Sequence, residues 1–164
     1  MNEATKQFFV KFYLQQASSD DYVDWAIACL EDGLDSKNLR MLASMGKPFY
    51  SSEIEDKFRL ALTELGFKYP SEKETLENYV KDLAKAIVKG EINPSDGCHK
   101  IYNVGVFLEY PREMTSWTFL DDGLEPGTYD TLYDLFEDTP SQNTDKWFKA
   151  IIEEAKKLAE TNFS

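Results

Sequence analysis

The sequence predicts an all-α fold: a single compact domain, residues 1–164, of about nine short antiparallel helices. Apolar side chains recur at intervals of three and four along most of the chain, which is the period of one helix face. Serine, asparagine or proline precedes many of these segments, and glycine follows several. The loops between them run to roughly two to six residues, a length that favours antiparallel neighbours.

The first three helices follow from these signals. The aromatic-rich segment 3–16 predicts one helix, and the pair Ser18-Ser19 offers a start for the second. Gly33 stands where that second helix should stop, because glycine readily takes the left-handed conformation found after a helix end. Ser36 opens a short third helix that Gly46 closes.

Two capping boxes predict the next two helices. Ser52 and Glu55 are spaced so that the serine oxygen and the carboxylate can each accept an unpaired backbone N–H, and Gly66 ends that helix. Ser71 and Glu74 repeat the pattern, and the second of these helices runs to residue 90.

The second half begins with Asn93-Pro94, because proline is tolerated at the first helical position. Its apolar run Val104–Leu108 has two interpretations, strand or helix, and the lack of a partner strand favours helix. A further helix ends at Gly123, and Pro126 or Thr128 opens another that ends before the loop 139–143. Thr144 caps the last one.

Composition is that of a folded protein. The chain is 42% hydrophobic and 14% aromatic, which is too apolar for a disordered acidic tail. A chain of this length should bury roughly 70% of the surface that its unfolded form exposes. A substantial core is therefore expected.

Negative charge is concentrated in one segment. Between Glu109 and Asp145 there are ten acidic residues and one basic residue, Arg112, so the segment contributes −9 of the net −12. The charge has two interpretations: solubility, or a binding face for a basic protein. Nucleic acid is disfavoured as a partner, because its phosphates would be repelled.

Within this segment, Asp130 and Asp134 recur at helical spacing with Glu137 or Asp138, beside a row of aromatic residues. An ordinary amphipathic helix explains the pattern, and so does a docking surface for lysine and arginine side chains. The candidate partner-binding residues are Asp121, Asp122, Glu125, Tyr129, Asp130, Tyr133, Asp134, Glu137 and Asp138.

No catalytic or cofactor-binding pattern accompanies the charge. His99 is the one histidine, so zinc sites that need two histidines are excluded. It neighbours Cys98, but adjacent side chains on a helix point about 100° apart and would not form a nucleophile–base pair. The run Asp121–Glu125 lacks the spacing of a calcium loop, so a solvated helix end is the better interpretation. We predict no catalytic residue, metal or cofactor.

Cysteine usage and hydropathy predict the compartment. The N-terminal residues show no basic region followed by an apolar run, and no apolar stretch approaches 18 residues. We therefore expect a cytoplasmic protein that does not span a membrane. Cys29 and Cys98 should then be buried thiols rather than a disulfide.

Two segments carry a resemblance to a known group of proteins. They are Tyr22-Val23-Asp24-Trp25-Ala26 with the following residues to Ala43, and Ile87–Pro94 with Gly97-Cys98. They resemble small, uncharacterised bacterial all-helical proteins, some of which are immunity proteins encoded beside toxins. The resemblance lies in the pattern of helix starts and stops. It implies inhibition of a toxin and supplies no catalytic residue.

Three functional hypotheses follow. The first is a protein-binding module, in its sharpest form an immunity protein that occludes a basic toxin domain. The second is a structural or regulatory adaptor that binds a helix or peptide in an apolar groove. A large uncovered aromatic patch near Phe8, Phe9 and Phe12, or near Tyr129 and Tyr133, would favour it. The third is an enzyme of unrecognised type, which would require a deep pocket holding His99 and several carboxylates.

Overall fold

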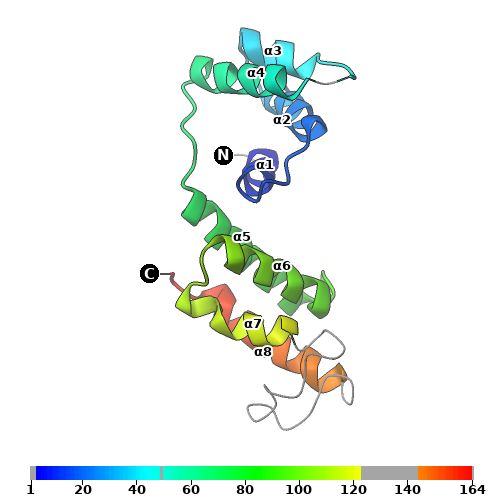
Figure 1. Cartoon of the computed structure of the whole chain (residues 1–164), viewed down its shortest axis with the longest axis vertical. Coiled ribbons are helices and arrows are strands. Elements are labelled where there is room, and N and C mark those ends of the chain that lie inside the picture. Colours follow the sequence, from blue (N-terminus) through cyan, green and yellow to red (C-terminus); the bar gives the residue numbers. More distant parts are fainter. Residues whose placement is uncertain (1–2, 49, 123–143, 164) are drawn as a thin grey trace. The chain divides into compact units, whose positions relative to one another are not determined.

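The computed structural model describes residues 3–48, 50–122 and 144–163 (Figure 1). The chain divides into two compact units, Met1–Thr75 and Leu76–Ser164, and each is described by itself. In the described residues the secondary structure is helix and loop, without a strand, which confirms the all-α class. The single-domain, antiparallel arrangement stays a prediction, and the helix predicted near 126–138 lies outside the described residues.

The first unit contains four helices: α1 (Glu3–Tyr13), α2 (Ser19–Glu31), α3 (Lys37–Ala43) and α4 (Ser51–Glu64). Helix α2 contacts the other three. Its start is the predicted one, because Ser18 and Asp21 accept each other's backbone N–H in a capping box. Its end is also as predicted, since Gly33 takes a positive φ of 85°.

One predicted capping box is wrong. Helix α4 begins at Ser51 and its N-cap is Tyr50, which makes no side-chain cap. Ser52 therefore lies inside the first turn, where its hydroxyl is not placed to cap the helix, and Glu55 projects from the second turn as an exposed side chain. Helix α3 likewise ends at Ala43, three residues before the predicted stop at Gly46.

The core of the first unit is built from aromatic rings. Phe8 and Phe9 of α1 are buried, and the Phe8 ring centroid lies 5.1 Å from that of Phe58 on α4. Trp25 of α2 packs edge-on against Phe58 at 4.9 Å, and its indole N–H donates to the Thr5 hydroxyl at 3.3 Å. Ring pairs of this kind stabilise by about 0.5–1.5 kcal/mol beyond the area they bury.

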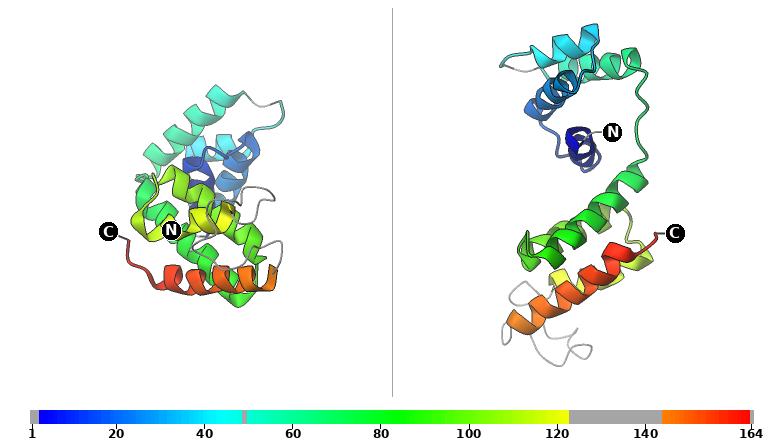
Figure 2. Two further views of the ribbon diagram at one scale, coloured as in Figure 1. Left: turned by 60° about the horizontal axis from the view of Figure 1, so that its bottom comes forward. Right: turned by 180° about the vertical axis from the view of Figure 1, so that it is seen from behind.

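The second unit contains α5, which begins just before the boundary (Glu72–Lys89), α6 (Pro94–Phe107), a 3₁₀ turn η1 (Arg112–Met114), α7 (Thr115–Asp122) and α8 (Thr144–Glu160). Helix α8, drawn in orange and red in Figure 2, contacts α6 and α7. Asn93 caps α6, and the helix continues to Phe107. The helical interpretation of the 104–108 run is therefore confirmed, apart from Leu108, which is the C-cap.

Close contacts fix the packing of these helices. Gly97 on α6 lies against Ile87 of α5, and a Cβ placed there would stand 2.6 Å from the isoleucine Cγ1. Trp147 of α8 is buried, and its indole N–H donates to the Leu120 carbonyl of α7 at 3.1 Å. Among the described helices, none is both long and apolar enough to cross a membrane.

Candidate functional site

Most of the predicted partner-binding residues lie outside the described part of the chain: Glu125, Tyr129, Asp130, Tyr133, Asp134, Glu137 and Asp138. The two that are described sit at the end of α7. Asp121 is buried, with 8% of its surface exposed, and Asp122 is half-buried. Asp121 therefore turns into the second unit instead of facing solvent. The binding role of the 109–145 segment stays a prediction.

Asp121 faces His99 of α6. Its two carboxylate oxygens each lie 3.2 Å from Nδ1 of the imidazole, whose side chain is 63% exposed. The packing of α6 on α7 brings these residues together across 22 positions of sequence, which no local pattern indicates. A carboxylate that contacts one ring nitrogen orients the imidazole, so Asp121 positions the His99 ring.

Cys98 does not complete a catalytic group with this pair. It is fully buried, and burial together with the nearby Asp121 carboxylate raises the pKa of its thiol. A buried, protonated thiol is a poor nucleophile. Cys29 is also free and buried, so the prediction of two buried, unbridged cysteines is confirmed. In the described ranges no three His, Cys, Asp or Glu side chains are grouped closely enough to hold a metal ion.

A second acidic surface lies on α2, and we call it the α2 face. Asp20, Asp24, Ile27 and Glu31 follow one another at intervals of three and four, so they share one side of the helix, and all are exposed. The sequence contains no lysine or arginine between residues 12 and 36. Within the described residues, Lys47 pairs with Asp20 at 3.1 Å, whereas Asp24 and Glu31 make no ion pair.

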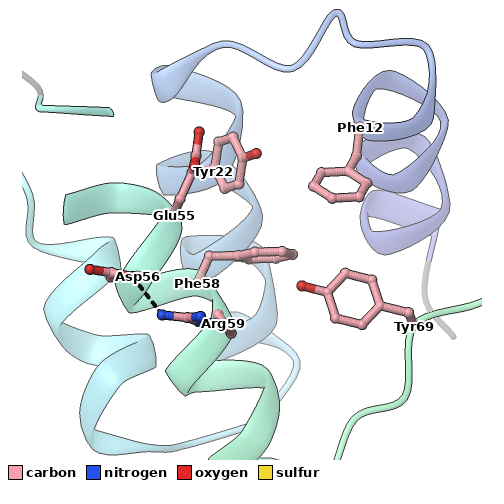
Figure 3. A pocket seen from close by; sticks show the side chains of 7 residues that line it. All are labelled: Phe12, Tyr22, Glu55, Asp56, Phe58, Arg59 and Tyr69. Atoms are coloured by element: carbon pink, nitrogen blue, oxygen red, sulfur yellow. Dashed lines mark hydrogen bonds and ion pairs between the residues drawn. The ribbon is translucent and has the colours of Figure 1, made fainter. Parts of the chain in front are cut away.

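The aromatic core of the first unit opens to solvent in a pocket of about 380 Å³, which we call the aromatic pocket. Figure 3 shows its lining, which comes from α1, α2, α4 and the segment after α4. The lining residues are Phe12, Tyr22, Glu55, Asp56, Phe58, Arg59 and Tyr69.

The rings of the aromatic pocket stand at steep angles to one another. Phe58 is buried at the centre, and Tyr22 and Tyr69 each make an angle of 85° with it, at centroid distances of 5.1 and 6.2 Å. Phe12 lies 6.0 Å from both Phe58 and Tyr69. In Figure 3 the Tyr22 and Phe12 rings both lie above the Phe58 ring, and the Tyr69 hydroxyl points toward it.

Charged side chains from α4 line the rest of the aromatic pocket. Arg59 pairs with Asp56 at 2.7 Å, as the dashed line in Figure 3 marks. Glu55 makes no ion pair or hydrogen bond among the described residues, so the three side chains leave one net negative charge. The charge affects the neighbouring tyrosine. Burial is the main cause that raises the pKa of Tyr22, and the Glu55 carboxylate is the next.

Sequence patterns gave partial signals for these surfaces. The α2 face could have been found from the run of six carboxylates between Asp20 and Asp35 without a basic residue. The aromatic pocket could not, because Phe12 and Tyr69 are 57 positions apart and meet through tertiary packing alone. Comparison of the chain with protein-family models, curated proteins and solved structures finds no match.

Proposed function

We propose that this chain is a protein-binding module for a basic partner, in its sharpest form an immunity protein that covers the cationic cleft of a toxin domain. The observation that carries the proposal is the α2 face, where Asp24 and Glu31, which make no ion pair in the part of the chain that the structure describes, flank Ile27, a side chain that is 40% exposed. Interfaces of this kind use charge to attract a partner and apolar side chains to hold it.

The charge of the whole chain supports the same conclusion. A net charge of −12 draws a basic protein toward the surface over long range, and such fields raise association rates by roughly ten- to a thousandfold. The 109–145 segment, with −9, adds to this field wherever its side chains lie. The proposed action is occlusion, which requires no catalytic group on this chain.

The adaptor hypothesis has narrower support. Phe8 and Phe9 are 5% and 0% exposed, so they offer little apolar surface to a helix or peptide. Phe12 does reach the aromatic pocket, where it lies beside carboxylates. The apolar and the anionic features therefore occur together in the first unit, which favours a basic partner over a purely apolar one. We further propose a reducing, cytoplasmic compartment, which the two free thiols support.

The test is complex formation with the product of the neighbouring gene, measured at low and at high salt. An electrostatic interface should weaken as salt screens the charges. Reversal of Asp130, Asp134 and Glu137 to lysine should slow association if the 109–145 segment contributes. Affinity that is independent of salt, or no complex with any basic protein, would contradict the proposal.

A further inference from the structure

The aromatic pocket has the shape of a receptor for a flat or compact cation. A cation is attracted to the face of an aromatic ring when it lies within about 6 Å of the ring centroid. Phe12, Tyr22 and Tyr69 pack against the buried Phe58 ring, with centroid distances of 5.1 to 6.2 Å. All four rings line the pocket, so a group that enters it lies beside several of them. A volume of about 380 Å³ is enough for one long side chain.

Its charge is complementary to a single positive group. Arg59 is engaged by Asp56, so it does not neutralise the Glu55 carboxylate. Glu55 projects from α4 into the lining beside Tyr22. An exposed carboxylate that makes no ion pair within the described ranges, next to aromatic rings, favours a positively charged ligand over a neutral or negative one.

The pocket is also held in shape before any ligand arrives. Tyr69 belongs to the segment after α4, and two contacts anchor that segment to α1. The Tyr13 hydroxyl donates to the Pro70 carbonyl at 2.5 Å, and Phe67 stacks on Phe9 at 6.0 Å with an interplanar angle of 3°. A preformed site loses less entropy on binding.

We propose that the aromatic pocket binds the guanidinium group of an arginine side chain on the basic partner, an inference that rests on the proposed function. Arginine fits better than lysine for two reasons. Its planar guanidinium stacks on aromatic rings, and its N–H groups can donate in pairs to the Glu55 carboxylate. The more strongly hydrated ammonium group of lysine would lose more water on entering.

The experiment titrates the peptide acetyl-Gly-Arg-Gly-amide into the full, isotope-labelled chain and follows the backbone amide signals by NMR. The expected shifts cluster near Phe12, Tyr22, Glu55 and Tyr69. Glu55→Gln and Tyr69→Ala should each weaken binding by about fivefold or more. Tyr69→Phe should retain it, because the ring face is kept.

Matched controls remove the same groups outside the pocket. Glu53→Gln removes a neighbouring exposed carboxylate of α4, and Tyr50→Ala removes a tyrosine that is 67% exposed. Both should change the affinity by less than about twofold, as expected for side chains outside the site. Thermal unfolding monitored by circular dichroism checks that Tyr69→Ala, a change at a half-exposed side chain, leaves the chain folded.

Three results would overturn the inference. The first is an equal effect of the pocket variants and the control variants. The second is an affinity for acetyl-Gly-Lys-Gly-amide or for tetramethylammonium that equals the affinity for the arginine peptide, and the third is occupation of the pocket by acetyl-Gly-Glu-Gly-amide through Arg59. The proposed function is tested separately, with an oligo-arginine peptide at low and high salt. If that peptide binds in a salt-dependent manner while the short peptide leaves the pocket unchanged, the pocket assignment fails and the proposed function stands. If the arginine peptide fills the pocket while the binding of oligo-arginine does not depend on salt, the pocket assignment stands and the proposed function fails.

Discussion

Tyr13 on α1 donates a hydrogen bond from its hydroxyl to the backbone carbonyl of Pro70, at 2.5 Å and across 57 positions of sequence. Burial, with added contributions from Glu72 and Tyr69, raises the pKa of this tyrosine, so the hydroxyl keeps the proton that it donates. The contact fixes the segment that carries Tyr69, and thereby one wall of the aromatic pocket. A partly buried residue that packs against the core thus positions a residue at the surface.

Tyr13→Phe should destabilise the chain by about 0.5–1.5 kcal/mol, because the Pro70 carbonyl loses its donor while the ring packing is kept. The same variant should weaken binding of the arginine peptide, since Tyr69 is less firmly held. Urea unfolding and NMR titration measure the two effects. Tyr50→Phe, at an exposed ring, is the control; a loss of stability equal to that of Tyr13→Phe would show that the contact contributes nothing.

Two glycines of α6 should respond in opposite ways to alanine. At Gly97 a Cβ would meet Ile87 Cγ1 at 2.6 Å and Ile92 Cδ1 at 2.9 Å, so Gly97→Ala should destabilise by about 1–3 kcal/mol. At Gly105 the nearest atom is Met114 Cε at 3.3 Å, the flexible end of its side chain. Gly105→Ala should therefore be neutral or stabilising by up to about 1 kcal/mol.

Thermal unfolding of the two variants measures the difference. Ile87→Val in the Gly97→Ala background should recover part of the stability, because it removes the isoleucine Cδ1, which would stand 2.7 Å from the new Cβ. Equal midpoints for Gly97→Ala and Gly105→Ala would mean that α5 and α6 do not pack as closely as described.

Acid should destabilise the first unit through Glu64. Its carboxylate accepts the Asn38 backbone N–H at 2.8 Å and the Asn38 side-chain amide at 2.6 Å. The Asn38 backbone N–H, then the Ser36 hydroxyl, holds the pKa of Glu64 below its usual range. Because the folded-state pKa is the lower one, this stabilisation is present above the ordinary glutamate value and is lost as the pH falls through the folded-state value.

Glu64→Gln should therefore lower the unfolding midpoint at neutral pH and should flatten its dependence on pH in the acid range. Unfolding midpoints of the wild type and the variant across that range provide the measurement. The control is Glu53→Gln, which removes an exposed carboxylate with no partner among the described residues. An unchanged acid dependence in Glu64→Gln would argue against this contact.

Both thiols should be unreactive in the folded chain. Cys29 and Cys98 are 1% and 0% exposed, and burial raises the pKa of each. An aromatic disulfide reagent should therefore modify these thiols only as fast as the structure opens. In denaturant it should react at the rate of an accessible thiol. Rapid modification of Cys98 under native conditions would instead indicate an accessible thiolate beside His99.

Helix starts and stops could be predicted where the signal is local. Ser18, Gly33 and Asn93 act as predicted, since each depends on neighbours within a few positions. The capping box at Ser52 is wrong because Ser51 and Ser52 are both helical. The N-cap is Tyr50, so the helix starts two positions earlier than the spacing of Ser52 and Glu55 predicts. The candidate sites were harder, because burial depends on the tertiary fold.

Asp121 illustrates the difficulty. In the sequence it is one more acidic residue in an acidic run, yet packing of α6 against α7 buries it against His99. Glu55 differs from its prediction in the opposite direction. It was predicted to cap a helix, and it is instead an exposed carboxylate that lines the aromatic pocket. The amino-acid composition gives the negative charge of the chain, and the tertiary fold determines which carboxylates are exposed to a partner.

Attraction of a basic partner by the α2 face is the central claim, and the rate of association with an immobilised oligo-arginine peptide tests it most directly. We predict that Asp24→Lys with Glu31→Lys slows association at low salt more than Glu53→Lys with Glu74→Lys. The second pair changes the net charge equally at exposed positions outside α2. Equal slowing by both pairs, or no association of the wild type at low salt, would contradict it.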